Sequence, residues 1–104
     1  MSIKVAINGF GRIGRPVLKR ILAKHPNLKV VAINDLTDTK TLAHLLKYDS
    51  SYGIYEKPVK FTDDSLIVGD DSEDNKIKVF AEKDPINLPW KEMNVDIVLE
   101  CTGY

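Results

Sequence analysis

The sequence has one cysteine, no net charge and no long apolar stretch at its start. The one cysteine, Cys101, has no partner for a disulfide within the chain. The 15 lysine and arginine residues equal the 15 aspartate and glutamate residues, so the net charge gives no reason to expect nucleic acid or an anionic membrane as the main partner. Met1 leads into the first strand without the apolar run of a signal peptide. These absences favour a cytoplasmic protein, and 104 residues suit one small domain.

A glycine-rich turn follows the first apolar segment. Residues 3–7 predict a strand that stops at Asn8, and Gly9, Gly11 and Gly14 come next at the spacing that binds a dinucleotide pyrophosphate. Gly9 allows the tight turn, Gly11 leaves room for phosphate oxygens, and Gly14 lets the next helix lie close to the sheet. That helix points its free amides and positive dipole end at the phosphates.

A carboxylate stands where such a turn needs one. Residues 29–33 predict a second strand that ends in Asn34 and Asp35, and this acid lies about 20 residues beyond the last glycine, the place of a ribose-binding carboxylate. Three glycines alone are weak support, because such turns also have purely structural uses. Strand, helix and acid together predict nucleotide binding in an α/β fold, a Rossmann-type parallel sheet flanked by helices.

Two helices carry the crossovers of this fold. The first should bury an apolar stripe, and the second should begin at a cap, Asp38 or Thr39, and turn its leucines toward the core. The residues expected to face the core are Ile13, Val17, Leu18, Ile21 and Leu22 in the first helix and Leu42, Leu45 and Leu46 in the second. His25 and His44 lack companions at metal-ligand spacing and are interpreted as surface or packing residues, so no metal site is expected.

In the second half of the chain, apolar residues recur at every second position, the spacing typical of β-strands. Alternating apolar residues between 57 and 80 predict three strands of a small antiparallel meander. Its acidic turn, residues 69–75, lacks the closing bidentate glutamate of a calcium loop and is interpreted as a solvated turn. Residues 48–53 predict a structural or interfacial loop, and Trp90 predicts a lid on the core.

The last predicted strand, residues 96–100, has no helix after it. A doubly wound domain normally has two halves, so the domain is expected to be incomplete and to leave apolar surface on this strand, which favours self-association. Neither a Ser/His/Asp nor a Cys/His set stands out, because Cys101 has no base beside it in sequence. The sequence predicts a cofactor site without a catalytic residue.

Four stretches resemble one family, the phosphorylating glyceraldehyde-3-phosphate dehydrogenases, over the amino-terminal part of those enzymes. These stretches are residues 6–15 (AINGFGRIGR), 31–35 (VAIND), 42–50 (LAHLLKYDS) and 99–103 (LECTG). The resemblance covers the chain in order, and its third stretch is more specific to the family than the glycines. It implies that residues 1–104 are the amino-terminal part of a dinucleotide-binding domain whose cofactor is NAD.

The resemblance also implies roles for single residues. The backbone of Arg12 and Ile13 would meet the pyrophosphate, Lys83 would border the adenine, and Thr102 and Gly103 would lie toward the nicotinamide. The glycine-rich turn, the end of the second predicted strand and the resemblance together predict eleven cofactor-binding residues. These are Asn8, Gly9, Gly11, Arg12, Ile13, Gly14, Asn34, Asp35, Lys83, Thr102 and Gly103. The chain departs from the family pattern in having lysine at 83, where arginine is usual, cysteine at 101, where serine is usual, and a longer acidic turn.

In the family, a cysteine thiolate and a histidine downstream of this region oxidise and phosphorylate glyceraldehyde 3-phosphate in glycolysis. The resemblance therefore implies an NAD-binding part of a homo-oligomeric enzyme, a tetramer in the family, with the sugar phosphate and phosphate as partners only of the complete enzyme. Chain 1–104 alone, whether an excised domain or a truncated product, is expected to be inactive. Erythrose-4-phosphate dehydrogenase and a non-catalytic nucleotide-binding or oligomerisation module stay open as alternatives. A downstream Cys-Thr-Thr-Asn stretch would decide between enzyme and module.

Overall fold

Two parallel strands, β1 (Ile3–Asn8) and β2 (Leu28–Asn34), pair side by side in the interior of the sheet. The computed structural model describes residues 3–11, 13–25, 27–48, 57–69, 75–84 and 87–101. On either side, β6 (Ile97–Glu100) pairs in parallel with β1 and β5 (Lys76–Phe80) pairs in parallel with β2. Buried apolar residues occur on both faces of β1 and β2, as is usual for strands that lie inside a parallel sheet.

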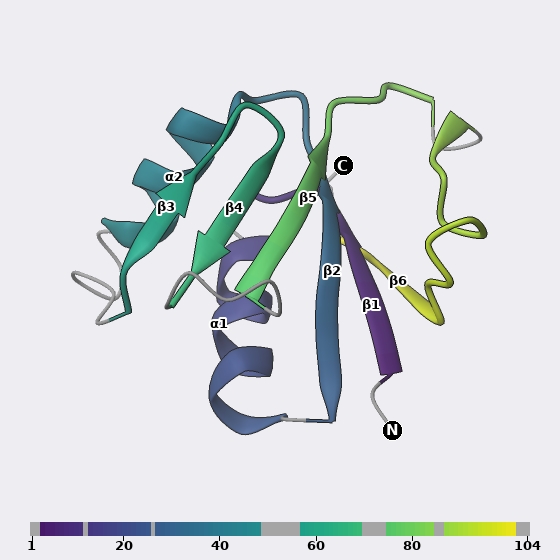
Figure 1. Cartoon of the computed structure of the whole chain (residues 1–104), viewed down its shortest axis with the longest axis horizontal. Coiled ribbons are helices and arrows are strands. Elements are labelled where there is room, and N and C mark those ends of the chain that lie inside the picture. The colour runs from purple at the N-terminus through teal and green to yellow at the C-terminus, as the bar shows by residue number, and fades with distance from the viewer. Residues whose placement is uncertain are drawn as a thin grey trace.

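The predicted meander continues the same sheet. β4 (Ser65–Val68) pairs antiparallel with β5, and β3 (Val59–Phe61) pairs antiparallel with β4. The order across the six-stranded sheet is β3-β4-β5-β2-β1-β6 (Figure 1). A parallel Rossmann-type half with an antiparallel extension is therefore confirmed. Of the acidic turn only Gly69 and Asn75 fall within the described residues, and of the loop at 48–53 only Tyr48 does.

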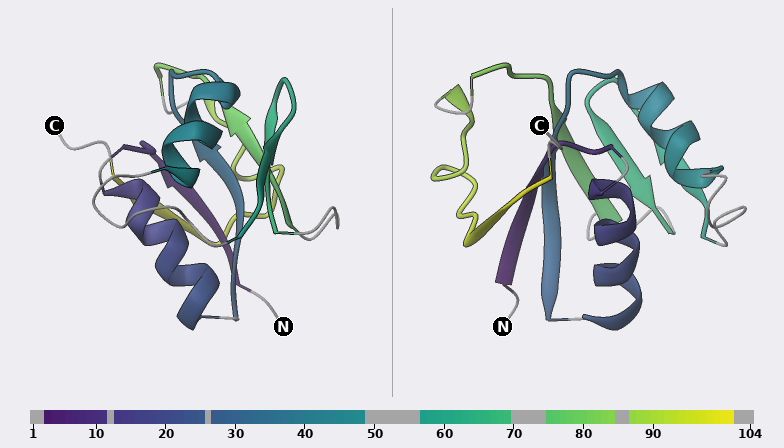
Figure 2. Two further views of the ribbon diagram at one scale, coloured as in Figure 1. Left: turned by 90° about the vertical axis from the view of Figure 1, so that its left-hand side faces the viewer. Right: turned by 180° about the vertical axis from the view of Figure 1, so that it is seen from behind.

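Both helices lie on one face of the sheet, as its two views show (Figure 2). α1 (Gly14–Lys24) connects β1 to β2, and α2 (Thr39–Lys47) follows β2 and packs against β3 and β4. Pro16 lies in the first turn of α1, where its missing N–H costs no helical hydrogen bond. Asp38 caps α2 by accepting a 2.7 Å hydrogen bond from the Thr41 amide, which lowers the pKa of Asp38 below its ordinary value.

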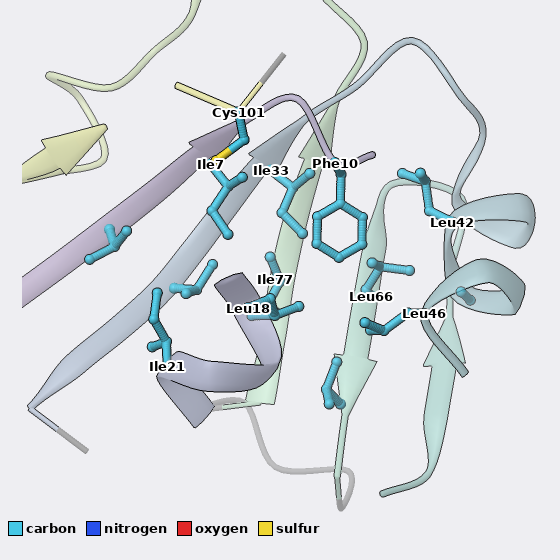
Figure 3. Packing of buried hydrophobic residues seen from close by; sticks show 14 residues of the cluster. Ile7, Phe10, Leu18, Ile21, Ile33, Leu42, Leu46, Leu66, Ile77 and Cys101 are labelled. Carbon is cyan, nitrogen blue, oxygen red and sulfur yellow. The ribbon is translucent and has the colours of Figure 1, made fainter. Parts of the chain in front are cut away.

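The core fills the space between this face and the helices (Figure 3). Leu18 and Ile21 of α1, Leu42 and Leu46 of α2, and inward residues of the strands are all buried. Phe10 projects from the glycine turn into the same cluster, so the turn is anchored by a buried aromatic ring. Burial of that ring, worth about 1.5–3 kcal/mol, links the turn after β1 to the core.

Two residues predicted to face the core do not. Ile13 is 55% exposed, because it precedes α1 at the edge of the sheet and lies beyond the core. Leu45 is 37% exposed, because the buried arc of α2 runs through Thr39, Leu42 and Leu46 and leaves Leu45 outside it. Both errors come from assigning apolar residues to a stripe without knowing its exact direction.

Other expectations concerned the surface. His25 and His44 are exposed, and within the described ranges no three His, Cys, Asp or Glu residues gather as a metal site would require. Trp90 is half-buried and packs edge-on against Phe80, with 5.7 Å between ring centroids, at the margin of the core. None of the helices in the described part of the chain combines the length and apolar character needed to cross a membrane.

The strand β6 forms one edge of the sheet. It pairs with β1, and its residues Ile97 and Val98, which point to opposite faces, are each at least 40% exposed. The expectation that this strand leaves apolar surface uncovered is confirmed, whereas self-association stays a prediction.

Candidate functional site

The carboxyl ends of β1, β2, β5 and β6 meet at one edge of the sheet, at the top of Figure 1. In an open α/β sheet this edge is where ligands bind. A cleft of about 550 Å³ lies there, a volume typical of small-molecule sites. Its lining consists of Asn8, Gly9, Gly11, Asn34, Asp35, Leu36, Thr37, Glu82, Lys83, Glu100 and Cys101.

The glycine turn is built around two close backbone approaches. Gly9 has a φ of 93°, a left-handed conformation that favours glycine, and its amide donates a 2.7 Å hydrogen bond to the Asn34 carbonyl. A Cβ on Gly14 would stand 2.3 Å from the Gly9 carbonyl oxygen, so only glycine lets the helix start here. The structural roles predicted for Gly9 and Gly14 are confirmed.

Gly11 differs from its two neighbours in the motif. A Cβ added there would meet no atom within 4 Å, so no packing contact in the described chain requires glycine at this position. The exposed backbone instead lies open beside the cleft that Gly11 helps to line. This open position fits the predicted approach of phosphate oxygens, which stays a prediction.

The carboxylate of Asp35 is held between the turn and the start of the next loop. Its Oδ2 accepts a 2.8 Å hydrogen bond from the Phe10 amide, and its Oδ1 accepts one of 2.9 Å from the Thr37 amide. Each carboxylate oxygen can accept more than one hydrogen bond, so acceptor capacity remains for a ligand in the cleft. The side chain is thus oriented before any ligand arrives, which reduces the entropic cost of binding.

Two buried amide side chains link the strand ends beneath the cleft. Asn34 donates a 2.9 Å hydrogen bond from Nδ2 to Oδ1 of Asn8. Asn8 in turn donates from its own Nδ2 to both carboxylate oxygens of Glu100, at 2.8 and 3.1 Å. These contacts join the carboxyl ends of β2, β1 and β6 into one polar network.

The structure brings together six of the eleven nominated residues in the cleft lining: Asn8, Gly9, Gly11, Asn34, Asp35 and Lys83. Gly14 is outside the lining and lies close to the Gly9 carbonyl. Ile13 is exposed before α1 and is also outside the lining. Arg12, Thr102 and Gly103 fall outside the described residues.

Sequence reasoning missed several residues of this edge. Phe10 contributes its amide to Asp35, and Thr37, Glu82 and Glu100 line the cleft. All four lie at or just beyond the carboxyl end of a parallel strand. That position was a usable signal, because such strand ends gather at one edge of the sheet.

Cys101 follows Glu100, the last residue of β6, and its side chain is buried at the edge of the core cluster (Figure 3). Burial raises the pKa of its thiol, and the neighbouring Glu100 charge raises it further. A raised pKa leaves less thiolate at any pH below it, which is the opposite of what an activated nucleophile needs.

We expect Cys101 to react more slowly with a disulfide reagent at pH 7 in the folded protein than in urea. Replacement by serine, Cys101→Ser, should leave affinity for NAD, the expected cofactor, within about twofold of wild type, or about 0.4 kcal/mol, because serine is close to cysteine in size and no cofactor contact is assigned to the thiol. Stopped-flow thiol titration and calorimetry measure the two quantities. Equal thiol rates in both states, or a tenfold loss of affinity, would contradict this interpretation.

Comparison with known proteins agrees with the geometry. The family described as "Glyceraldehyde 3-phosphate dehydrogenase, NAD binding domain" matches residues 3–104. A glyceraldehyde-3-phosphate dehydrogenase of Thermotoga maritima is 59% identical over 101 residues, which cover 96% of this chain and 29% of the relative. The corresponding protein of Geobacillus stearothermophilus is 53% identical over 103 residues, or 99% of this chain and 29% of the relative.

A third relative, the glyceraldehyde-3-phosphate dehydrogenase of Mycoplasma pneumoniae, is 54% identical over 102 residues, again with 98% of this chain and 29% of the relative covered. The chain therefore spans about three tenths of the length of these relatives. With a family match that covers residues 3–104, the chain belongs to the family of NAD-binding domains of glyceraldehyde 3-phosphate dehydrogenase.

Proposed function

We propose that this chain is the cofactor-holding part of an enzyme that oxidises and phosphorylates glyceraldehyde 3-phosphate with NAD in glycolysis. The observation that carries the proposal is the Asp35 carboxylate, fixed by the Phe10 and Thr37 amides in the lining of the cleft that the glycine turn also lines. Family membership supports the same cofactor. The length of the relatives supports a role as one part of a larger catalytic protein.

The residues at the edge of the sheet suit the adenosine side of NAD. Asp35 would accept hydrogen bonds from the ribose hydroxyls, and the open backbone at Gly11 would receive the pyrophosphate. Lys83 follows β5, on the opposite side of β2 from β1 and its turn, and would border the adenine. Backbone groups of Arg12 and Ile13 on the pyrophosphate, and Thr102 and Gly103 toward the nicotinamide, complete the proposed set.

When bound, NAD supplies the nicotinamide ring that accepts a hydride from the substrate. The part proposed for this chain is to bind and orient, which can lower a reaction barrier by removing entropy in advance. Orientation alone does not stabilise a transition state, and we propose no residue of this chain as nucleophile or base. The chain by itself is therefore expected to bind NAD weakly and to be inactive.

A chimera tests the proposed function. Residues 1–104 replace the matching segment of the Thermotoga maritima relative, and NADH absorbance is followed with glyceraldehyde 3-phosphate, NAD and phosphate. We expect turnover by the chimera and none by the chain alone, because the relative supplies the remaining groups. Turnover by the isolated chain, or a chimera that is folded yet fails to bind NAD, would contradict the proposal. Erythrose 4-phosphate is tested as the competing substrate on the intact native protein that contains this chain, because in the chimera the relative supplies the substrate groups.

We propose further that the complete protein is cytoplasmic and homo-oligomeric. The single cysteine and the balanced charge support the first proposal. The exposed apolar residues Ile97 and Val98 on the edge strand support additional pairing or packing there in the complete protein.

A further inference from the structure

The side chain of Asn34 donates both of its Nδ2 hydrogens to other groups of the protein. It is 5% exposed, and one hydrogen of Nδ2 is donated to Oδ1 of Asn8. The other is donated to the Glu82 carbonyl at 2.9 Å, while Oδ1 accepts from the Glu82 amide at 2.9 Å. The side-chain amide therefore makes a two-point contact with the backbone of Glu82, as a neighbouring strand would.

This contact extends the pairing of β2 with the chain after β5. The last backbone hydrogen bond between the two segments runs from the Asp35 amide to the Phe80 carbonyl, at 2.8 Å. Glu82 lies two residues further on, beyond the end of β5 and its strand pairing. Asn34 thus fixes the segment of Glu82 and Lys83, which lines the cleft beside Asp35.

The orientation of Asn34 is set by the next amide in the network. A carboxylate only accepts hydrogen bonds, so Glu100 requires Nδ2 of Asn8 to face it. Oδ1 of Asn8 then points to Asn34 and demands a donor there. Consequently Nδ2 of Asn34 faces Asn8, and its Oδ1 faces the Glu82 amide.

Strand order indicates what this segment borders. The glycine turn follows β1, Asp35 follows β2, and Glu82 with Lys83 follows β5, on the opposite side of β2 from β1. A nucleotide with its phosphates at the turn and its ribose at Asp35 would therefore extend its base toward the Glu82 segment.

We propose that Asn34 is a positioning residue: it holds the Glu82–Lys83 segment as the wall beside the base of the cofactor, and Asn8 sets its orientation. The proposal rests on the proposed function for the identity of the ligand, whereas the clamp on Glu82 exists without a ligand. Asn34 in this role acts through Glu82 and does not need to touch NAD.

The test compares Asn34→Ala, which removes the clamp, with Asn34→Asp, which keeps the shape but turns an acceptor toward the Glu82 carbonyl. Asn27→Ala and Asn27→Asp are matched controls, because Asn27 is exposed and lies at the opposite end of the sheet. All are made in the intact native protein that contains this chain. The readouts are KM for NAD, kcat, affinity for AMP and for nicotinamide mononucleotide, and hydrogen exchange of the Glu82 amide.

In both Asn34 variants we expect KM for NAD and the dissociation constant for AMP to rise roughly tenfold, the ratio that corresponds to losing one or two buried hydrogen bonds. kcat and nicotinamide mononucleotide affinity should stay within about twofold. In Asn34→Ala, exchange of the Glu82 amide should accelerate about tenfold or more, since this amide loses its acceptor. A general loss of structure would instead lower the affinity for both AMP and nicotinamide mononucleotide.

Unchanged Glu82 exchange in Asn34→Ala would overturn the proposal, as would an effect on AMP in Asn34→Asp alone, which would assign it to the new charge. A wild-type protein that does not bind NAD would refute the proposed function. It would also refute the proposal that the Glu82–Lys83 segment lies beside the base of the cofactor. The Glu82 exchange measurement would still decide the clamp in that case.

Discussion

Gly14→Ala is expected to lower the free energy of unfolding by about 3 kcal/mol, near the top of the range for overpacked positions. The new Cβ would stand 2.3 Å from the Gly9 carbonyl oxygen and 3.3 Å from its carbon, and both are backbone atoms that cannot rotate away. The helix start and the turn must therefore separate. In an open helical position the same substitution would gain up to about 1 kcal/mol from helix propensity, so the sign itself is informative.

Gly11→Ala is the matched control within the same turn. A Cβ at this position meets no atom within 4 Å, so stability should change by at most about 0.5 kcal/mol. NAD affinity should nevertheless fall, because the methyl group would occupy the space proposed for phosphate. Urea unfolding followed by circular dichroism, with calorimetry for NAD, separates the two effects. Equal stability of Gly14→Ala and wild type would refute the close approach of α1 to the turn.

Asp35→Ala is expected to weaken NAD binding by roughly tenfold to a hundredfold, because hydrogen bonds to a charged acceptor are worth about 1.5–3 kcal/mol. The carboxylate would also repel a 2′-phosphate, so wild type should prefer NAD to NADP and the variant should lose that preference. Calorimetric titration with both cofactors measures this. Equal wild-type affinities for the two would contradict the assignment of Asp35.

Two further variants refine the Asp35 result. Asp63→Ala removes an exposed carboxylate from the turn between β3 and β4, away from the cleft, and should leave both affinities unchanged. Asp35→Asn keeps the shape but replaces one carboxylate oxygen with an NH2 group, which cannot accept; since Phe10 and Thr37 donate to different oxygens, one of these two hydrogen bonds is lost. We expect its affinity to fall as well, partly through loss of orientation.

Local patterns predicted much of this fold. The spacing of Gly9 and Gly14 between a strand and a helix predicts their structural roles, and the position before a helix predicts a cap at Asp38 or Thr39, of which Asp38 is the cap, because turn and cap geometry depends on a few neighbouring residues. Ile13 and Leu45 were misplaced, because burial depends on which direction a helix faces once it packs. That direction is a tertiary property.

The interior of the site was predictable only in part. Asn34 was nominated from its place beside Asp35, but its contact with Glu82 joins residues 48 positions apart, and no local signal pairs them. Phe10 lies inside the glycine motif, yet its buried ring and its hydrogen bond to Asp35 depend on α1, β2 and the core together. Long-range partners of this kind need a structure, or at least the strand order.

A thermodynamic cycle between Asp35 and the ribose hydroxyl tests the central claim most directly. Affinities of wild type and Asp35→Ala are measured for NAD and for its analogue without the 2′-hydroxyl on the adenosine ribose. If this carboxylate binds that hydroxyl, removing either should forfeit the same interaction, and the coupling energy should be about 1.5 kcal/mol or more. A coupling energy of zero, with both proteins folded and binding NAD, would contradict the account.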